Sequence, residues 1–404
     1  MEEIEIPSYF LCPISIQLMR DPVTISTGIT YDRESIEKWL FTFKKSSCPV
    51  TKQPISGRDS DHLTPNHTLR RLIQAWCTLH AAAGIERIPT PTPQLTKSHI
   101  AKLLTEAKKS SNNLLKCFHV IKSMVQTGQN NRYLENSGAV EFLAGVIRNG
   151  DVSTSEEAVS VLFNIGASEC SLKKIVNNEN GGEFVESITR VLNSGSFQTR
   201  VSCITLMRSV FEVADPTHLI GVKMEFFSEV VRLLKDNIAT KTVLKLLMEV
   251  CPWGRNRIKA VEAGAVAALV EILIDQTIIG GGKRINELCM VVLDQLCGCA
   301  EGRAALLGHA AGVAVVGKKI LRVSHETTNR AVRILSSVSR FSGNPKVLQE
   351  MMQVGIVSKL CLVLQVDVSL RTKERATEML RVHSKVWKKS ACIPHHLISS
   401  YPCS

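Results

Sequence analysis

A short phrase built around glycine recurs through most of the chain, and it constrains the fold more than any other feature. The clear copies are Ser137-Gly138-Ala139-Val140, Ala263-Gly264-Ala265-Val266 and Val354-Gly355-Ile356-Val357, with weaker copies at Gly182, Gly221 and Gly312. Successive glycines lie 39 to 48 residues apart, and a fixed period of about 40–47 residues is typical of stacked helical repeats. Glycine suits this place because it permits a sharp turn between a short helix and the next one.

Amphipathic segments of helical period accompany these phrases. They lie at residues 98–126, 155–166, 198–214, 241–250, 284–297, 327–339 and 371–386. The pattern predicts that residues 98–404 form an α-solenoid, whose stacked third helices line one continuous groove. Residues 81–97 carry alternating prolines at 89, 91 and 93 and are predicted to form an extended linker.

Residues 1–80 follow a different plan, which combines a small hairpin with two helices. Val23, Ile25, Ile29 and Tyr31 predict two short strands that turn near Gly28. The first helix is predicted to begin after Asp32 as N-cap, with an apolar stripe of Ile36, Trp39, Leu40 and Phe43. The second helix is predicted to begin near Asn66, with a stripe of Leu69, Leu72, Ile73 and Trp76.

That order of elements is the plan of a RING-like fold, in which two zinc ions need eight Cys or His ligands in close pairs. Residues 1–80 contain only Cys12, Cys48, Cys77, His62, His67 and His80, with no CxxC pair. We therefore expect no metal, and loops that are held by hydrogen bonds, ion pairs and packing. The candidates for that network are Arg20, Asp21, Asp32, Arg33 and Glu34, and the sequence does not say which of them pair.

Four runs occur in a fixed order in this part of the chain: CPISIQLMRDPV, GITYDR, IEKWL and CPVTKQP. Together they resemble a U-box, the zinc-free relative of the RING finger, over roughly residues 5–80. The glycine phrases resemble armadillo repeats, and the combination is similar to the plant U-box/armadillo E3 ubiquitin ligases. The expected fold is mainly α, with a small α+β U-box followed by an α-solenoid of armadillo repeats.

The resemblance implies an E3 ligase that needs no cofactor. The U-box would dock a ubiquitin-loaded E2 and promote direct transfer to a substrate lysine, while the armadillo repeats recruit the protein substrate, in stress or immune signalling. By position in the U-box motifs, the E2 contacts would be Ile14, Ile16, Trp39 and Pro49, and Lys52 would bridge E2 and ubiquitin. From pattern alone, Ile14 and Ile16 are as readily core residues, Trp39 a core anchor and Lys52 a solvated lysine.

Two other interpretations concern the chemistry. Cys12 and Cys48 are not expected to form a thioester with ubiquitin, because nothing nearby in the sequence supplies a base or a charge that would lower a thiol pKa. The alternative from another class is a non-catalytic armadillo adaptor with an inert U-box. An in vitro ubiquitination assay separates the two.

The formal net charge of +12 is unevenly distributed. Residues 1–80 are neutral, so the excess belongs to the rest of the chain. Several predicted third helices end in basic residues: Arg208, Arg330, Arg333, Arg371, Lys373 and Arg375. Two interpretations stay open: a groove for an acidic partner or weak association with an anionic membrane, and a solvated basic face. No nucleic-acid partner is expected. We expect a cytoplasmic protein, with the nucleus or the membrane periphery as alternatives, and leave open a homodimer through the U-box.

Overall fold

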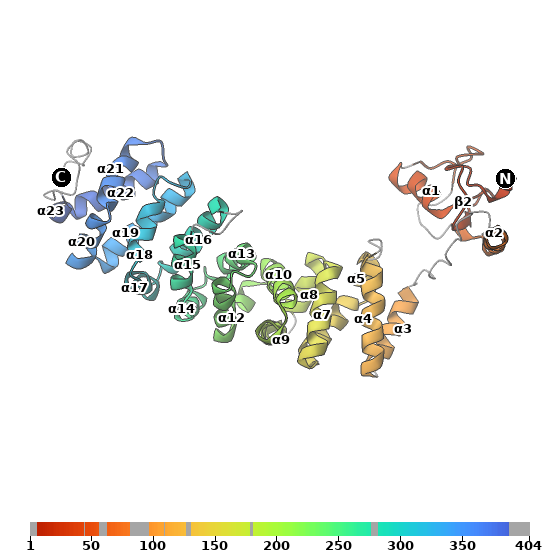
Figure 1. Ribbon diagram of the computed structural model, residues 1–404, viewed down its shortest axis with the longest axis horizontal. Coiled ribbons are helices and arrows are strands. Elements are labelled where there is room, and N and C mark those ends of the chain that lie inside the picture. Colours follow the sequence, from red (N-terminus) through yellow and green to blue (C-terminus); the bar gives the residue numbers. More distant parts are fainter. Residues whose placement is uncertain are drawn as a thin grey trace. The chain divides into compact units, whose positions relative to one another are not determined.

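A computed structural model of the protein describes residues 6–43, 45–55, 63–80, 97–108, 110–126, 131–177, 181–275 and 282–387. The chain divides into two compact units, Met1–Leu95 and Thr96–Ser404, which are drawn in Figure 1. The predicted linker falls almost wholly outside the described residues. The boundaries proposed from the sequence therefore stay predictions.

The first unit contains a three-stranded antiparallel sheet with the order β2-β1-β3. Strand β1 spans Pro22–Thr24, β2 spans Thr30–Asp32 and β3 spans Thr64–Pro65. The predicted hairpin is confirmed, with Val23 opposite Tyr31 and a turn in which Gly28 has a φ of 79°, a value that glycine adopts without strain. The sequence did not predict β3, which is only two residues long and ends in a proline.

The helices of the first unit are η1 (Ser8–Phe10), α1 (Arg33–Glu37), the π-helical η2 (Lys38–Thr42) and α2 (His67–Leu79). In η2 the Phe43 N–H donates to the Lys38 oxygen at 3.0 Å, five residues back. The wider π turn shifts the helical register. Phe43 is consequently 63% exposed, and its predicted place on the buried stripe is wrong.

Helix α2 begins as predicted, because the Asn66 side chain accepts a hydrogen bond from the Leu69 N–H at 3.0 Å. The buried positions of this helix are Ile73 and Cys77. Leu72 is 53% exposed, so its predicted place on the buried stripe is also wrong. The true stripe advances by four residues from Leu69, and Leu72 lies beside it.

The second unit is an array of short helices, in which the third helix of each repeat stacks on the next (Figure 1). These third helices are α4 (Ser111–Gln126), α7 (Val152–Ile165), α10 (Phe197–Val213), α13 (Thr240–Val250), α16 (Gly282–Leu296), α19 (His325–Ser342) and α22 (Leu370–Val382). They coincide with the amphipathic segments that the sequence indicated. The segment at 98–126 proves to be two helices, because α3 (Lys97–Ala107) precedes α4.

The first and second helices of the repeats come between them. They are α5 (Asn131–Asn136) and α6 (Ala139–Asn149), α8 (Glu169–Val176) and α9 (Gly181–Ser194), α11 (Pro216–Ile220) and α12 (Met224–Lys235), α14 (Gly254–Glu262) and α15 (Ala265–Ile274), α17 (Ala300–Gly308) and α18 (Gly312–Lys319), and α20 (Pro345–Gln353) and α21 (Ile356–Gln365), with α23 (Ser384–Trp387) last. Basic side chains tie neighbouring repeats together: Arg232 donates to the Asn193 oxygen at 2.9 Å and Lys359 to the Gly317 oxygen at 2.6 Å.

The glycines of the three clear phrases act as the sequence predicted. Each precedes a second helix and has a left-handed φ of 76° to 89°: Gly138, Gly264 and Gly355. The same explanation is wrong for the weaker copies. Gly221 has a φ of −82°, Gly182 lies inside α9, and Gly312 is required by space, because a Cβ there would lie 2.1 Å from the Leu306 oxygen.

Within the described residues, no single helix is both long and apolar enough to cross a membrane. Only α20 and α21 taken together reach that length and composition, and a bend of 66° separates them.

Candidate docking site on the first unit

Two loops of the first unit share one sequence pattern and one hydrogen-bond pattern. In the first loop, Cys12 N–H donates to the Gln17 oxygen and Ile16 N–H to the Cys12 oxygen, both at 2.8 Å. In the second loop, Cys48 N–H donates to the Gln53 oxygen at 2.8 Å and Lys52 N–H to the Cys48 oxygen at 2.9 Å. The two Cys-Pro runs therefore build the same turn twice, with the thiol at the inner end of each.

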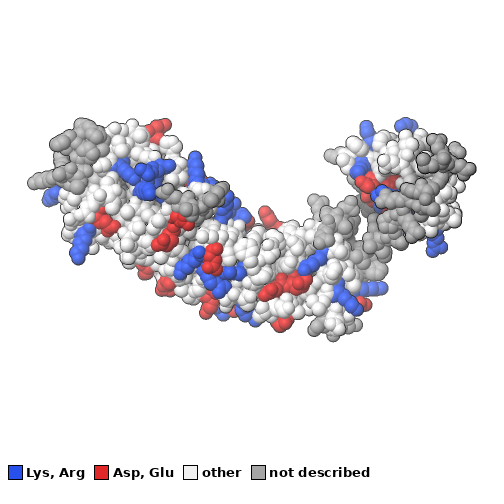
Figure 2. Space-filling view, viewed as in Figure 1, with Lys and Arg blue, Asp and Glu red and all other residues white. Residues whose placement is uncertain are grey.

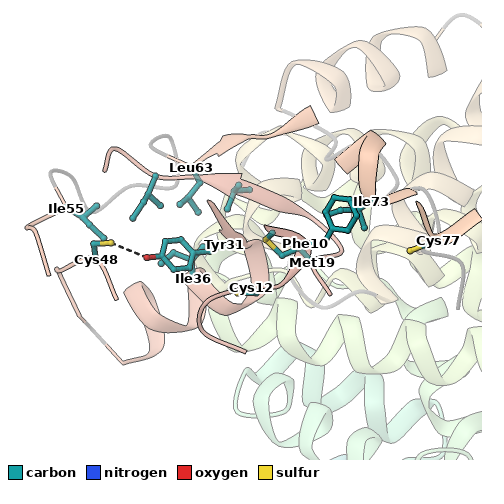
Figure 3. Packing of buried hydrophobic residues seen from close by; sticks show 12 residues of the cluster. Phe10, Cys12, Met19, Tyr31, Ile36, Cys48, Ile55, Leu63, Ile73 and Cys77 are labelled. Carbon is teal, nitrogen blue, oxygen red and sulfur yellow. Dashed lines mark hydrogen bonds between the residues drawn. The ribbon is translucent and has the colours of Figure 1, made fainter. Parts of the chain in front are cut away.

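Both loops are attached to consecutive residues of β2. The backbone N–H of Asp32 donates to the Cys12 sulfur at 3.3 Å, and the hydroxyl of Tyr31 lies 3.1 Å from the Cys48 sulfur, the contact marked in Figure 3. The same hydroxyl accepts a hydrogen bond from the Val50 N–H at 3.3 Å. One strand thus fixes the positions of the two loops relative to each other.

The two thiols are buried, with Cys12 1% and Cys48 0% exposed. Burial works to raise the pKa of Cys48, but hydrogen bonds from Thr27, Thr51 and Tyr31 outweigh it and lower that pKa to about 6. Burial likewise works to raise the pKa of Cys12, but hydrogen bonds from Asp32, Ser15 and Ile14 lower it. The sequence was expected to supply no base or charge that lowers a thiol pKa, and the lowering comes from hydrogen bonds instead. Burial, rather than an ordinary pKa, is what argues against these thiols as nucleophiles.

We expect replacement of Cys48 by alanine to destabilise the first unit by about 2–3 kcal/mol, because the Tyr31 hydroxyl and the Thr51 N–H lose a buried acceptor. In the wild-type protein the thiolate is the favoured form in the fold, so this stabilisation is complete above the unfolded thiol's pKa of 9.0 and is lost as pH falls through about 6. Fluorine NMR of fluorotryptophan at Trp39 and Trp76 would report unfolding of this unit alone.

The matched variant is Cys48→Ser, which keeps an acceptor and removes the titration. Its denaturation midpoint should depend less on pH between 6 and 9, because only Cys12 still titrates with a lowered pKa, whereas the wild-type protein should gain at least about 1 kcal/mol more over that range. Equal pH dependence in the two proteins would show that the Cys48 thiol does not ionise in the fold.

An ion-pair network joins the hairpin to both helices of the first unit. The Asp21 carboxylate lies 2.7 Å from Arg33 and 3.5 Å from Arg70. Asp32 is the N-cap of α1 as predicted, but its side chain makes no bond to that helix. It accepts instead from the backbone N–H groups of Arg20 and Asp21 at 2.8 and 2.9 Å. Of the predicted candidates, Asp21 and Arg33 form the ion pair, Asp32 accepts from the backbone of Arg20, and Glu34 pairs with Lys38 outside this network. Arg70 is the member that the sequence did not suggest.

The structure places the two loop-tip candidates on the surface. Ile16 is 77% exposed with a φ of 54°, and Lys52 is exposed with a φ of 60°. These residues occupy the same position in their respective loops, immediately before the glutamine. The core interpretation of Ile16 is therefore excluded, and both tips present their side chains to solvent.

The other three candidates are half-buried. Ile14 and Trp39 pack against the core of the unit, and Trp39 Nε1 donates to the Ser47 oxygen at 2.8 Å, which holds the start of the second loop. Pro49 is half-buried in that loop. Sequence reasoning did not single out Val50, which is 52% exposed. The repeated Cys-Pro pattern could have found it, since Val50 matches Ile14.

Among the residues that the structure describes, no group of three or more His, Cys, Asp or Glu side chains is arranged to hold a metal ion. The hydrogen bonds to Cys12 and Cys48 and the ion pairs of Asp21 hold the loops in this unit.

Comparisons with known proteins agree with this architecture. A profile described as "U-box domain" matches residues 6–82, and one described as "Plant U-box protein ARM repeat region" matches residues 99–403. The chain is 51% identical to the E3 ubiquitin-protein ligase PUB23 of Arabidopsis thaliana, covering 100% of this chain and 98% of that protein. It is 48% identical to the Arabidopsis ligase PUB22, covering 99% of each.

Among solved structures, an engineered protein aligns with 83% of this chain and 77% of its own, at 17% identity and a TM-score of 0.53. A chain from work on the interaction between cadherin and beta-catenin aligns with 78% of this chain and 58% of its own, at 15% identity and a TM-score of 0.56. Identities this low show a shared fold only.

The chain therefore belongs to the plant U-box proteins in which armadillo repeats follow the U-box. It is an E3 ubiquitin-protein ligase, and hence a ubiquitin transferase. Its partners are an E2, ubiquitin and a protein substrate that the armadillo repeats bind.

Proposed function

We propose that the U-box docks the ubiquitin-loaded E2 on the surface formed by its two loops and by Trp39. Ile14, Ile16, Trp39 and Pro49 supply the apolar contact, and Lys52 bridges E2 and ubiquitin. The observation that carries the proposal is the state of Ile16. A β-branched residue with a φ of 54° and 77% exposure is strained and leaves apolar surface in water. Such outliers are typical of functional positions.

In the proposed reaction, ubiquitin passes directly from the E2 to the substrate. The ε-amine of a substrate lysine attacks the thioester carbonyl, a C–N bond forms, and the C–S bond breaks to release the E2 thiol. The U-box contributes position, because it restricts a tethered ubiquitin to orientations from which attack succeeds. The burial of Cys12 and Cys48 supports a route with no thioester on either of these U-box cysteines.

We propose further that the protein acts in the cytoplasm in stress or immune signalling, with the nucleus or the membrane periphery as alternative locations. The support is the resemblance to plant U-box ligases with this domain order. A homodimer through the U-box and weak association with anionic membranes belong to the same proposal. Size-exclusion chromatography with light scattering and sedimentation with anionic vesicles test these two points.

The experiment that tests docking is discharge of ubiquitin-loaded E2 enzymes onto free lysine, with Lys52 as the variable. Arginine forks two hydrogen bonds where lysine offers a point charge, so Lys52→Arg should raise the discharge rate roughly threefold. Lys52→Asn should lower it by about tenfold, without added backbone strain, because asparagine tolerates the φ of 60° at this position. Equal rates for the three proteins would remove Lys52 from the docking surface. Failure of the wild-type protein to discharge any E2 of a broad panel would favour the alternative interpretation, a non-catalytic armadillo adaptor.

A further inference from the structure

A basic pocket lies between three third helices near the C-terminal end of the solenoid. It is lined from α16 and the residues after it, from α19 and from α22, and its volume is about 210 Å³. Figure 2 shows Lys and Arg side chains gathered over α22 and the adjacent end of α19. Pockets for small organic ligands are usually larger, about 300–1,000 Å³. This one is suited to a small polar group that belongs to a larger partner.

The charges in this pocket are unequal. Arg333, Arg340 and Arg375 line it together with the carboxylate of Asp294, which leaves two positive charges in excess. Asp294 is 8% exposed and lies 3.0 Å from Arg330 and 3.3 Å from Arg333. Arg330 also forms an ion pair with Glu326, so its positive charge is balanced outside the pocket. The buried Asp294 carboxylate therefore holds Arg333 in place, and this ion pair uses only some of the hydrogen-bond donors of Arg333.

The remaining arginines have donors to spare. Among the described residues, Arg375 has neither an ion pair nor a hydrogen bond, although it is half-buried. Arg340 has one distant carboxylate, that of Glu378 at 4.0 Å, and both side chains are largely exposed. The Ser336 hydroxyl also lines the pocket. Guanidinium groups with unused donors can fork two hydrogen bonds to the oxygens of an anion.

An aromatic ring stands at the edge of the same pocket. Phe341 is 65% exposed, and its ring lies 5.0 Å from the guanidinium of Arg303 and 5.5 Å from that of Arg340. These cation–π contacts fix the ring and the Arg340 head together. Exposed apolar surface beside a charged pocket is typical of a site for a peptide side chain next to the recognised group.

We propose that this pocket binds the phosphate of a phosphoserine or phosphothreonine in an extended segment of the substrate. This inference rests on the proposed function, because it names the chemistry by which the armadillo groove selects its substrate. A phosphate monoester carries a charge of about −1.5 to −2 at neutral pH, which matches the excess of the lining residues. Arginine forks satisfy its oxygens in pairs, and Phe341 contacts a residue that flanks it.

Two other anions fit less well. A single carboxylate carries one charge and would leave part of the arginine cluster uncompensated. A membrane presents its phosphates as a broad surface, whereas these arginines line a small pocket between helices, beside an exposed ring. The stacked third helices leave a groove along which an extended chain can lie.

Binding of the full-length protein to three degenerate fluorescent peptide libraries tests the proposal. The libraries differ only at a fixed central residue, which is phosphoserine, glutamate or serine. We expect the phosphoserine library to bind at least about tenfold more tightly than either other library. Arg375→Ala should lose that preference, while Arg381→Ala, an exposed arginine of the same helix outside the pocket, should keep it. Thermal unfolding checks that both variants fold.

Each outcome decides a separate question. Equal binding of the three libraries, or an unchanged preference in Arg375→Ala, would refute phosphate binding in this pocket. Glutamate as tight as phosphoserine would overturn its selectivity for a dianion. Binding to vesicles of phosphatidylcholine and phosphatidylserine that depends on Arg375, without phosphopeptide binding, would assign the arginines to a membrane and refute the proposal. Discharge of loaded E2 by the same wild-type preparation reports on the U-box, so a failure there is distinct from a failure of the pocket.

Discussion

Replacement of Ile16 by asparagine is expected to leave the U-box at least as stable as the wild-type protein and to abolish most of its ligase activity. The two effects come from different properties of one residue. Ile16 has a φ of 54°, which is costly for a β-branched side chain by about 1–3 kcal/mol and much easier for asparagine. Its apolar side chain, 77% exposed, is the surface that the proposed docking requires.

The activity loss should be large, because Ile16 is placed at the centre of the proposed contact. Loss of a central anchor at an interface costs about 2 kcal/mol or more, and each 1.4 kcal/mol is roughly a tenfold change. We therefore expect discharge of loaded E2 to slow by roughly thirtyfold. The measurement is the discharge rate onto free lysine, combined with the thermal midpoint.

Leu79→Gln is the matched control, since Leu79 is 78% exposed on α2 and lies outside the proposed surface. It should discharge E2 at the wild-type rate. A wild-type rate for Ile16→Asn with every E2 of a broad panel would remove the first loop from the docking surface. A lowered thermal midpoint would show that the backbone strain at Ile16 had been overestimated.

The second large effect concerns the fold of the U-box. We expect Asp21→Ala to destabilise this unit by about 3 kcal/mol, because it leaves two mostly buried guanidinium groups without their main partner. Arg33 is 15% and Arg70 20% exposed at the side chain, and only Glu37, at 3.7 Å from Arg33, stays within reach. Small units have little stability in reserve, so much of the U-box should be unfolded at elevated temperature.

Fluorine NMR of fluorotryptophan at Trp39 and Trp76 separates this loss from the behaviour of the solenoid, whose tryptophans should be unaffected. The control is Glu34→Ala. Glu34 pairs with Lys38 at 2.6 Å, but both side chains are largely exposed, and such pairs contribute little. If Asp21→Ala and Glu34→Ala unfold alike, the Asp21 network does not hold the hairpin to the helices.

The local turns and caps of the U-box could be read from the sequence because each depends on one residue type. Gly28 permits the hairpin turn, and Asn66 caps α2. The left-handed turns at the repeat glycines could be predicted from the sequence for the same reason. The predicted buried stripes were wrong at two positions. A π turn exposes Phe43, and in α2 the buried positions are spaced four residues apart, which leaves Leu72 exposed. Periodicity alone carries neither piece of information.

Two features that the sequence could not supply depend on contacts between distant residues. Arg70 is 49 positions from Asp21, and only the folded chain brings the two together. The lowered pKa of Cys48 has the same origin, since Thr27 and Tyr31 come from the hairpin. The strain at Ile16 depends on the loop's own hydrogen bonds. The E2 contacts themselves stay predictions, because the structure gives their exposure and not their partner.

The attachment of both loops to Tyr31 and Asp32 has a consequence for how such a ligase can change over evolutionary time. One anchor is the backbone N–H of Asp32 and the other is the phenol of the preceding residue, Tyr31, so the interval between the anchors is set by one peptide unit and one rigid, buried ring. If Ile16 and Lys52 contact the E2 as proposed, mutations at these tips would change which E2 is accepted without disturbing the anchors. Partner choice and structural integrity are thereby open to selection independently.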